Sequence, residues 1–311
     1  MLADPADETA HPSGPELLWG ESWYFDFASR IGDLGGYVRV GHYPNLGVVW
    51  YWACLVGEDR PLVMVVDHAV PPPRPGSLEL RNPGLWADHN VEEPLQRWSL
   101  GLEAFGVALD DPADAYRGLV GDRTALGFDL EWETDGEPYA WPAGLDRYEI
   151  PCRVHGEILV GDERVELDGV GQRDHSWGVR DWWASGWCWT AFHLDDGTHL
   201  HAVVPDGIPV ALGYLQEPGR GVRDNQIGAV EAVPGPDGIP VRAHLDVDAL
   251  RVDVDPVAWA PVLLIGPDGR ESRFPRALAR CEVSGSSGAA PGPGDTLRRG
   301  VGWIEFNQPP A

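Results

Sequence analysis

The chain has 311 residues, of which 43% are hydrophobic, and 23 basic against 49 acidic side chains give a formal net charge of −26. This length predicts one large domain or two of about 150 residues, while the acidity excludes a general phosphate-backbone binder and docking on anionic lipid. All the basic residues are arginine, so Schiff-base lysine enzymes and the Walker A nucleotide-binding loop are excluded as well.

The chain begins with an acidic and polar segment, residues 1–14. It has neither the basic start nor the apolar centre of a secretory signal, so we expect a disordered tail and a cytoplasmic protein. The longest uncharged apolar stretch, 46–56, is well short of the ~20 residues that span a bilayer, so we expect no membrane insertion. The four cysteines are widely spaced and predict buried free thiols.

The regular elements are predicted to be short strands. The 39 glycines and 29 prolines interrupt the chain often, which disfavours long helices. One short helix is predicted over 111–119, with Asp110 or Asp111 as its cap and Pro112 in its first turn. Between turn signals lie β-branched and aromatic runs that predict an all-β sandwich or barrel. These runs are 36–40, 47–56, 62–66, 126–132, 148–155, 157–160, 164–170, 186–194, 199–204, 241–254, 262–265, 276–283 and 300–306.

The segment 139–146 is the best candidate for a boundary between two halves. Its sequence, YAWPAGLD, carries turn signals, and strand-like residues resume directly after it. We therefore expect an N-terminal domain over 15–145 and a C-terminal domain over 146–311.

The run 48–54 is apolar or aromatic on both of its faces. Alternation along a strand puts Trp52 on one face and Tyr51 on the other. This strand is therefore expected to be covered on both sides or to line a cavity, and both side chains are candidates for substrate binding.

A hairpin is predicted around Asp195, Asp196 and Gly197. A three-residue loop would pair His193 with His199, whereas a two-residue turn would move His199 to the opposite face. We favour the three-residue loop.

In that register one face of the hairpin carries aromatic and histidine side chains. Trp187, Trp189 and His201 share it with the histidine pair. His201, farther from the turn, is the better candidate for a ligand pocket. Histidines alternating on neighbouring strands also suit zinc or iron, so a metal site of His193, His199 and His201 is an alternative.

The densest chemistry lies in 171–183, GQRDHSWGVRDWW. One interpretation is a structural corner, in which arginines pair with aspartates and tryptophans pack. The other is an acid–base centre, since histidine titrates near neutrality and the carboxylate of Asp174 can orient the His175 ring. Tryptophan faces such as those of Trp177 and Trp182 can stabilise a developing cation. The sequence leaves both interpretations open.

This block, together with GGYVRVGHYPN, VWYWACLV, RYEIPC and GWIEFNQP, resembles the carotenoid 1,2-hydratase (hydroxyneurosporene synthase) and AttH-like superfamily of lipocalin-related proteins. The resemblance spans roughly residues 20–308 and is closest to bacterial members with the GQRDHSWGxRDWW motif. It implies two calycin-type β-barrels or half-barrels around a hydrophobic ligand cavity. His175 and Trp177 match the His and Trp of the motif. The Tyr and Asp that the hydratases use on a later strand have no counterpart, because His199-Leu200-His201 stands there, which puts carotenoid hydration itself in doubt.

These observations together predict a cofactor-independent enzyme that acts on a hydrophobic, isoprenoid or polyketide-like molecule by hydration, isomerisation or cyclisation. Asp174 and His175 are the expected acid–base pair. A non-catalytic carrier of a lipid or terpenoid and a metal-dependent enzyme with the histidine cluster are the alternatives, and no nucleic-acid partner is expected. The expected substrate-binding residues are Trp177, Trp182, Trp187, Trp189, His201, Trp52 and Tyr51.

Overall fold

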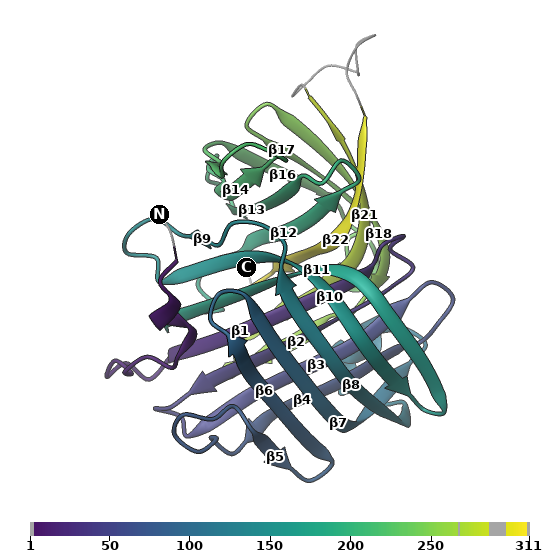
Figure 1. Cartoon of the computed structure of the whole chain (residues 1–311). Helices are drawn as coiled ribbons and strands as arrows, with labels where there is room; N and C mark the ends of the chain where they lie inside the picture. Colours follow the sequence, from purple (N-terminus) through teal and green to yellow (C-terminus); the bar gives the residue numbers. More distant parts are fainter. Residues whose placement is uncertain (1–2, 267, 286–296, 310–311) are drawn as a thin grey trace.

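The computed structural model describes residues 3–266, 268–285 and 297–309, and it is almost entirely β, as the sequence predicts. Figure 1 shows a purple-to-teal sheet from the first part of the chain beside a green-to-yellow sheet from the second. The first sheet holds β1 (Trp19–Ser29), β2 (Leu34–Tyr43), β3 (Val48–Gly57), β4 (Leu62–Val70), β5 (Leu80–Asn82), β6 (Leu85–Glu93), β7 (Arg97–Leu109), β8 (Asp122–Thr134), β9 (Tyr139–Ala140), β10 (Arg147–Val160) and β11 (Glu163–Val179).

The first sheet closes on itself. Its strands follow the order β4-β3-β2-β1-β11-β10-β8-β7, and β7 pairs back with β4 where Leu62 faces Leu109. β6 and β5 continue beyond β7, and β9 pairs with β10. Inward-facing aromatic and aliphatic side chains, among them Phe25 and Trp132, fill the barrel and form a buried core. This is the barrel architecture expected for a lipocalin-like fold.

The second sheet is a curled sheet with strand order β15-β14-β13-β12-β22-β21-β18-β17-β16, and a small β19–β20 hairpin lies beside it. Its own core lies along β12, β13 and β18, and a third core fills the space between the two sheets. The strands are β12 (Trp187–Leu194), β13 (His199–Pro205), β14 (Leu212–Gln216), β15 (Arg223–Asp224), β16 (Gly228–Val233), β17 (Arg242–Val247), β18 (Leu250–Trp259), β19 (Val262–Ile265), β20 (Glu271–Phe274), β21 (Arg276–Ser284) and β22 (Arg298–Asn307).

Hydrogen bonds between buried side chains and backbone fix the two sheets against each other. The indole Nε1 of Trp303 in β22 donates to the carbonyl of Phe27 in β1 at 2.9 Å. The hydroxyl of Tyr37 in β2 donates to the carbonyl of Ala260, after β18, at 3.1 Å. Buried polar groups that are paired in this way favour one arrangement of the sheets over others.

The chain passes from one sheet to the other at 180–186, and not at 145. β10 pairs with β8, and β11 pairs with both β10 and β1, so residues 147–179 are part of the barrel wall. The turn predicted at 139–146 exists, but it joins strands of the same sheet. The segment 171–183 therefore runs along the barrel wall and then into the crossover, rather than within the second sheet.

Two local predictions are confirmed. The 3₁₀-helix η2 (Pro112–Arg117) is capped by Asp111, whose side chain accepts a hydrogen bond from the amide of Ala113 at 2.9 Å. In the hairpin between β12 and β13, His193 faces His199, as a three-residue loop requires. Gly197 adopts φ = 83° in this loop, a left-handed conformation that glycine accepts readily.

The N-terminal segment is ordered over residues 3–14, in contrast to the disordered tail that we predicted. It contains the 3₁₀-helix η1 (Pro5–Glu8), and Glu8 is 3% exposed. The Glu8 carboxylate accepts from the amide of Leu95, the indole of Trp98 and the hydroxyl of Tyr148, and it forms an ion pair with Arg173. The segment is therefore anchored at the barrel by a buried charge.

All four cysteines are buried and free, as the sequence predicts. Within the part of the chain that the structure describes, no helix has the length and apolar character needed to cross a membrane.

Gly171 in β11 tests how tightly the barrel wall is packed. A Cβ at this position would overlap the carbonyl oxygen of Asp26, so Gly171→Ala must push β1 and β11 apart. We expect a loss of at least about 1–3 kcal/mol in the free energy of unfolding, measured by chemical denaturation. The control is Gly101→Ala in β7, whose Cβ would make ordinary van der Waals contacts with Trp86 side-chain atoms at 3.4 Å and the carbonyl oxygen of Asp88 at 3.8 Å. Equal stabilities of the two variants would contradict this account of the strand contact.

Candidate active site

A cavity of about 460 Å³ lies between the barrel and the second sheet, beside the crossover. Successive residues of a strand point to opposite faces, so alternate residues of β1 and β11 leave the barrel and face the second sheet. Tyr24 and Asp174 are direct partners in this pairing, and both line the cavity. Residues 203 and 205 of β13, Phe274 of β20 and Glu305 of β22 line it from the other sheet.

Four of the expected substrate-binding tryptophans line this cavity: Trp177, Trp182, Trp187 and Trp189. Trp182 packs between Trp187 and Phe274, at centroid distances of 5.5 and 5.6 Å. Its indole is oriented by a hydrogen bond to the Tyr43 hydroxyl at 3.0 Å. The cavity wall is thus aromatic and held in place.

The other three expected substrate-binding residues lie outside this lining. Trp52 is buried behind it and donates through Nε1 to Nε2 of His68 at 2.8 Å. Tyr51 points to the opposite face of β3 and belongs to the barrel core. His201 is completely buried, and its Nδ1 lies 3.0 Å from the carbonyl of Thr190, to which it donates. Alternation separated Trp52 from Tyr51 correctly, but the sequence could not show which face meets the cavity.

Asp174 provides a carboxyl group at the cavity wall. Its Oδ2 accepts a hydrogen bond from Nη2 of Arg147 at 2.8 Å, and Arg147 also binds Glu149 through Nε at 2.6 Å. Burial raises the pKa of Asp174 to about 6, an effect that Arg147 opposes and Glu149 reinforces. A carboxyl group with this pKa can donate or accept a proton near neutral pH.

Glu149 lies behind this carboxyl group and supports it. It is fully buried and accepts from Gln172 at 3.0 Å and from the indole of Trp189 at 3.4 Å. Its Oε1 lies 3.3 Å from Nε2 of His201. Burial raises the pKa of Glu149 and, with Arg147 nearby, lowers that of His201 well below its usual value, so the His201 ring is neutral.

Arg39 is the most unusual group in the cavity lining. Its guanidinium is 4% exposed and lies between Trp52 and Trp182, at 4.5 and 5.1 Å from their ring centroids. Nη2 reaches the hydroxyl of Tyr43 at 3.4 Å, and Nη1 has no hydrogen-bond partner among the described residues. Asp174 and Glu305 interact with Arg39 electrostatically, but among the described residues no carboxylate forms a direct ion pair with it. A buried cation without a direct ion pair is costly, so this position favours a ligand that brings negative charge.

The structure does not bring Asp174 and His175 together as an acid–base pair. Adjacent residues in an extended strand point to opposite sides, so Asp174 faces the cavity while His175 faces into the barrel. There His175 stacks on Trp23 at a centroid distance of 4.6 Å and contacts Glu21. The two adjacent residues of the DHSWG motif therefore lie in different environments, Asp174 at the cavity and His175 inside the barrel.

His193, His199 and His201 share a face of the hairpin, but they do not converge on one point. Nδ1 of His193 lies 3.1 Å from Nδ1 of His199, and Nε2 of His199 lies 2.8 Å from the carbonyl of Asp135. His201 turns instead toward Thr190 and Glu149. The metal site predicted from these three residues is thus not formed.

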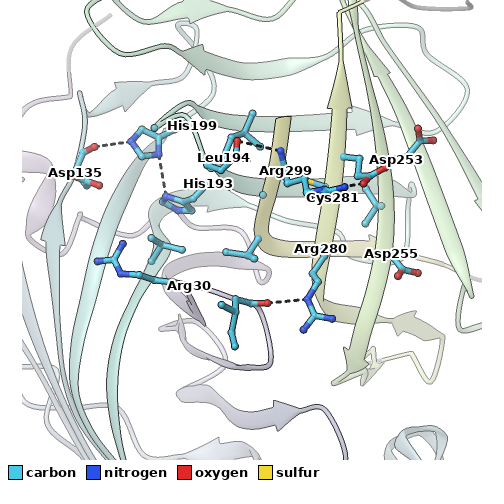
Figure 2. A pocket seen from close by; sticks show the side chains of 18 of the residues that line it. Arg30, Asp135, His193, Leu194, His199, Asp253, Asp255, Arg280, Cys281 and Arg299 are labelled. Atoms are coloured by element: carbon cyan, nitrogen blue, oxygen red, sulfur yellow. Dashed lines mark hydrogen bonds and ion pairs between the residues drawn. The ribbon is translucent and has the colours of Figure 1, made fainter. Parts of the chain in front are cut away.

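A second, larger cleft of about 1090 Å³ contains the His193–His199 pair (Figure 2). Most of its charged side chains bind one another or nearby groups. Arg280 binds Glu58 at 2.8 Å, and Arg299 binds Glu282 at 3.1 Å. These paired surface charges call for no ligand, so the smaller aromatic cavity is the better candidate for the site.

Sequence reasoning missed the charged part of the site. Arg39 is visible in the sequence as a charge within an apolar strand, where pairing with an acidic neighbour is favoured in so acidic a chain and a clamp for a ligand carboxylate is the alternative. Arg147 and Glu149 flank a tyrosine in RYEIPC, where alternation could place them on a common face. Their contact with Asp174 depends on the pairing of β10 with β11, which no local pattern specifies.

The comparisons with known proteins support the fold. The sequence matches the family described as "Domain of unknown function (DUF7064)" over residues 4–310. No curated protein shows a significant match. A structure from Nitrosomonas europaea described as AttH (NE1406) is similar with a TM-score of 0.65 and 14% identity, covering 98% of this chain and 96% of that one.

Two further structures are similar over nearly the full length. CghA with Sch210972 gives a TM-score of 0.57 at 14% identity, covering 99% of this chain and 96% of that one. Kievitone hydratase from Nectria haematococca gives 0.56 at 12% identity, with coverages of 99% and 95%. These likenesses show that the chain shares its fold with these proteins.

Proposed function

The chain belongs to the DUF7064 family, and we propose that it is a cofactor-independent enzyme for a hydrophobic small molecule that carries an acidic oxygen. The observation that carries this proposal is one aromatic cavity that holds both a carboxyl group with a raised pKa and a buried guanidinium with an unpaired N–H. The similar folds of CghA and kievitone hydratase are consistent with it.

The cavity has the size and lining of a small-molecule site. Its volume of about 460 Å³ lies within the ~300–1,000 Å³ typical of ligand pockets. Tryptophan side chains supply an apolar wall, and charged side chains, among them Arg39 and Asp174, are set into it. Such a site would hold a flexible apolar chain in a folded shape and so reduce the entropy lost in reaching a reactive conformation.

The position of Arg39 favours isomerisation or cyclisation of an acidic substrate over hydration of a plain hydrocarbon. Four guanidinium groups line the cavity, and four carboxyl groups, those of Asp146, Asp174, Asp181 and Glu305, line it as well, so it has no large excess of positive charge. Directly beside Arg39, however, a carbocation would be destabilised by repulsion. A carboxylate, enolate or phenolate would instead be stabilised by Arg39. We therefore favour a polyketide-like substrate, with Arg39 binding its oxygen and Asp174 donating the proton. The four arginines are Arg39, Arg147, Arg180 and Arg276.

An anionic fluorescent probe tests the Arg39 assignment without knowledge of the substrate. We expect 8-anilinonaphthalene-1-sulfonate to bind the cavity more tightly than the neutral N-phenyl-1-naphthylamine, read by energy transfer from tryptophan. Arg39→Gln should weaken sulfonate binding about 10- to 100-fold, since a hydrogen bond to a charged group contributes about 1.5–3 kcal/mol. Binding of the neutral probe should change less than about twofold.

Arg81→Gln is the matched control, because Arg81 is exposed on β5 and is not among the residues that line the cavity. If Arg39→Gln lost affinity equally for both probes, the arginine would only support the packing of the cavity wall. Equal affinity of the wild type for both probes would remove the case for an acidic substrate.

Native mass spectrometry of protein purified from its own host identifies the molecule that the cavity holds. An enzyme should convert the recovered compound, or its immediate precursor, in the presence of the purified chain. Recovery of a compound that stays unchanged under all conditions would instead favour the carrier alternative. The cytoplasmic location expected from the sequence is a prediction that the same preparation can check by fractionation.

A further inference from the structure

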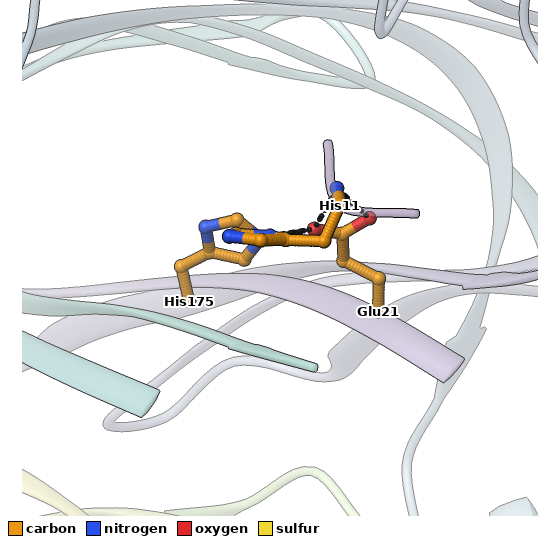
Figure 3. Close-up of side chains that lie close together, drawn as sticks. All are labelled: His11, Glu21 and His175. Atoms are coloured by element: carbon orange, nitrogen blue, oxygen red, sulfur yellow. Dashed lines mark hydrogen bonds and ion pairs between the residues drawn. The ribbon is translucent and has the colours of Figure 1, made fainter. Parts of the chain in front are cut away.

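We propose that His11, Glu21 and His175 form a binding site for a divalent transition-metal ion, separate from the cavity of the proposed enzyme. The three side chains come from the N-terminal segment, β1 and β11 (Figure 3). Their donor atoms all lie within 4.8 Å of one another. Two imidazoles and one carboxylate are a ligand set that suits zinc, iron(II) or cobalt(II) rather than magnesium or calcium.

The distances are those of a site that needs little rearrangement. Oε1 of Glu21 lies 2.8 Å from Nδ1 of His11 and 2.9 Å from Nε2 of His175. Neighbouring ligands of an octahedral ion with bonds of ~2.1 Å are about 3.0 Å apart, and those of a tetrahedral ion about 3.4 Å. Small rotations of these side chains would therefore admit an ion between them.

The outer nitrogen of each ring has an oxygen acceptor nearby, as expected for a ring whose inner nitrogen binds a metal. Nδ1 of His175 lies 2.6 Å from the carbonyl of Asp7, so this nitrogen carries the proton and donates it. Nε2 of His11 lies 3.5 Å from the Asp7 carboxylate. Metal-binding histidines usually have their second nitrogen oriented by such a carbonyl or carboxylate. In a neutral pair of rings, two nitrogen lone pairs would then face one carboxylate oxygen.

The ligands are also held firmly. Glu21 and His175 are each 1% exposed, and the His11 ring is stacked on Trp177 at a centroid distance of 3.7 Å. Burial makes nitrogen and carboxylate lone pairs without a donor costly, because water cannot reach them. A cation shared by the three groups would remove this cost. The rival explanation is a proton on one ring, which would form an ordinary ion pair with Glu21.

An ion here would fasten the N-terminal segment to the barrel wall. His11 is the only ligand from that segment, whereas Glu21 and His175 belong to paired strands. His175 faces into the barrel and Asp174 faces the cavity, although the His11 ring also contacts Trp177, which lines the cavity. The readouts of the inference are therefore metal content and thermal stability, which need no turnover, so its failure is distinguishable from failure of the proposed function.

The test uses the full chain after treatment with a chelator, dialysed against Zn²⁺ or Co²⁺ alone. We expect one tightly bound ion per chain by elemental analysis, visible-range absorption of the cobalt form, and a higher thermal midpoint with zinc. Mutating a residue that hydrogen-bonds to a metal ligand usually lowers metal affinity 10- to 100-fold. His11→Ala removes a ligand itself, so it should lower the affinity at least about 100-fold. Glu21→Gln should lose the ion as well.

His155→Ala is the matched control. It removes the histidine of the other described group of potential ligands, Glu131, Glu133 and His155, all partly exposed. This variant should bind the ion as the wild type does. No bound ion at micromolar metal, equal binding by His11→Ala, or loss in His155→Ala alone would each overturn the proposal. Circular dichroism of each variant without metal establishes that it has folded.

Discussion

Glu8→Ala is expected to lower the free energy of unfolding by about 3–5 kcal/mol, the usual cost of removing one member of a buried ion pair. Arg173 is 2% exposed, and its Nε and Nη2 already have no partner among the described residues. Without Glu8 its 2.9 Å contact through Nη1 would be lost too. The indole of Trp98 and the hydroxyl of Tyr148 would lose their acceptor at the same time.

Denaturation followed by circular dichroism measures this loss, with Asp4→Ala as the control. Asp4 caps the same short helix from an exposed position, so its removal should cost no more than about 1 kcal/mol. Glu8→Gln keeps the shape and one acceptor oxygen, and should fall between the two. If Glu8→Ala were as stable as Asp4→Ala, the segment would not be anchored as described.

This anchor also shows why the segment looked disordered in the sequence. An acidic, proline-containing stretch without apolar periodicity is usually solvated. The partners that order it, Leu95, Trp98, Tyr148 and Arg173, are 87 or more residues away along the chain. No local pattern reveals that one glutamate in such a stretch meets an unpaired buried arginine.

Local features were predictable where the physical cause is local. Asp111 and Pro112 specify the start of η2 on their own, and the loop 195–197 fixes the register that brings His193 opposite His199. The position of β10 and β11 depends on pairing across the barrel, so the turn at 139–146 was located correctly but misread as a boundary. Alternation along a strand was sufficient to place Asp174 and His175 on opposite faces. We paired them because they are adjacent in the sequence motif.

Asp174→Asn is expected to lower turnover of the natural substrate by about 10²- to 10⁴-fold, the usual contribution of a positioned proton donor or acceptor. The asparagine keeps the size of the side chain, and Arg147 retains Glu149 at 2.6 Å, so the cavity should keep its shape. Substrate affinity should therefore change little. The substrate is the compound identified by mass spectrometry, and Asp168→Asn, an exposed position on the same strand, is the control.

The pH dependence identifies the role of the carboxyl group. Burial raises the pKa of Asp174 from 3.8 to about 6, so the protonated form persists below about pH 6 in the folded protein. If Asp174 donates the proton, as we propose, the rate should be constant below that pH and fall about tenfold per unit above it. The Asn variant should show no inflection there. An inflection near pH 6 that survives in Asp174→Asn would assign the proton transfer to another group.

The same shift has the opposite sign for stability from that of most carboxylates. The folded chain binds this proton more tightly than the unfolded chain, so the contribution of Asp174 decreases as pH rises from about 4 to about 6 and stays low above that. Asp174→Asn should remove this part of the pH dependence of unfolding. A variant that kept this part of the pH dependence would mean that another group takes up the proton on folding, and that the pKa of Asp174 is not raised as described.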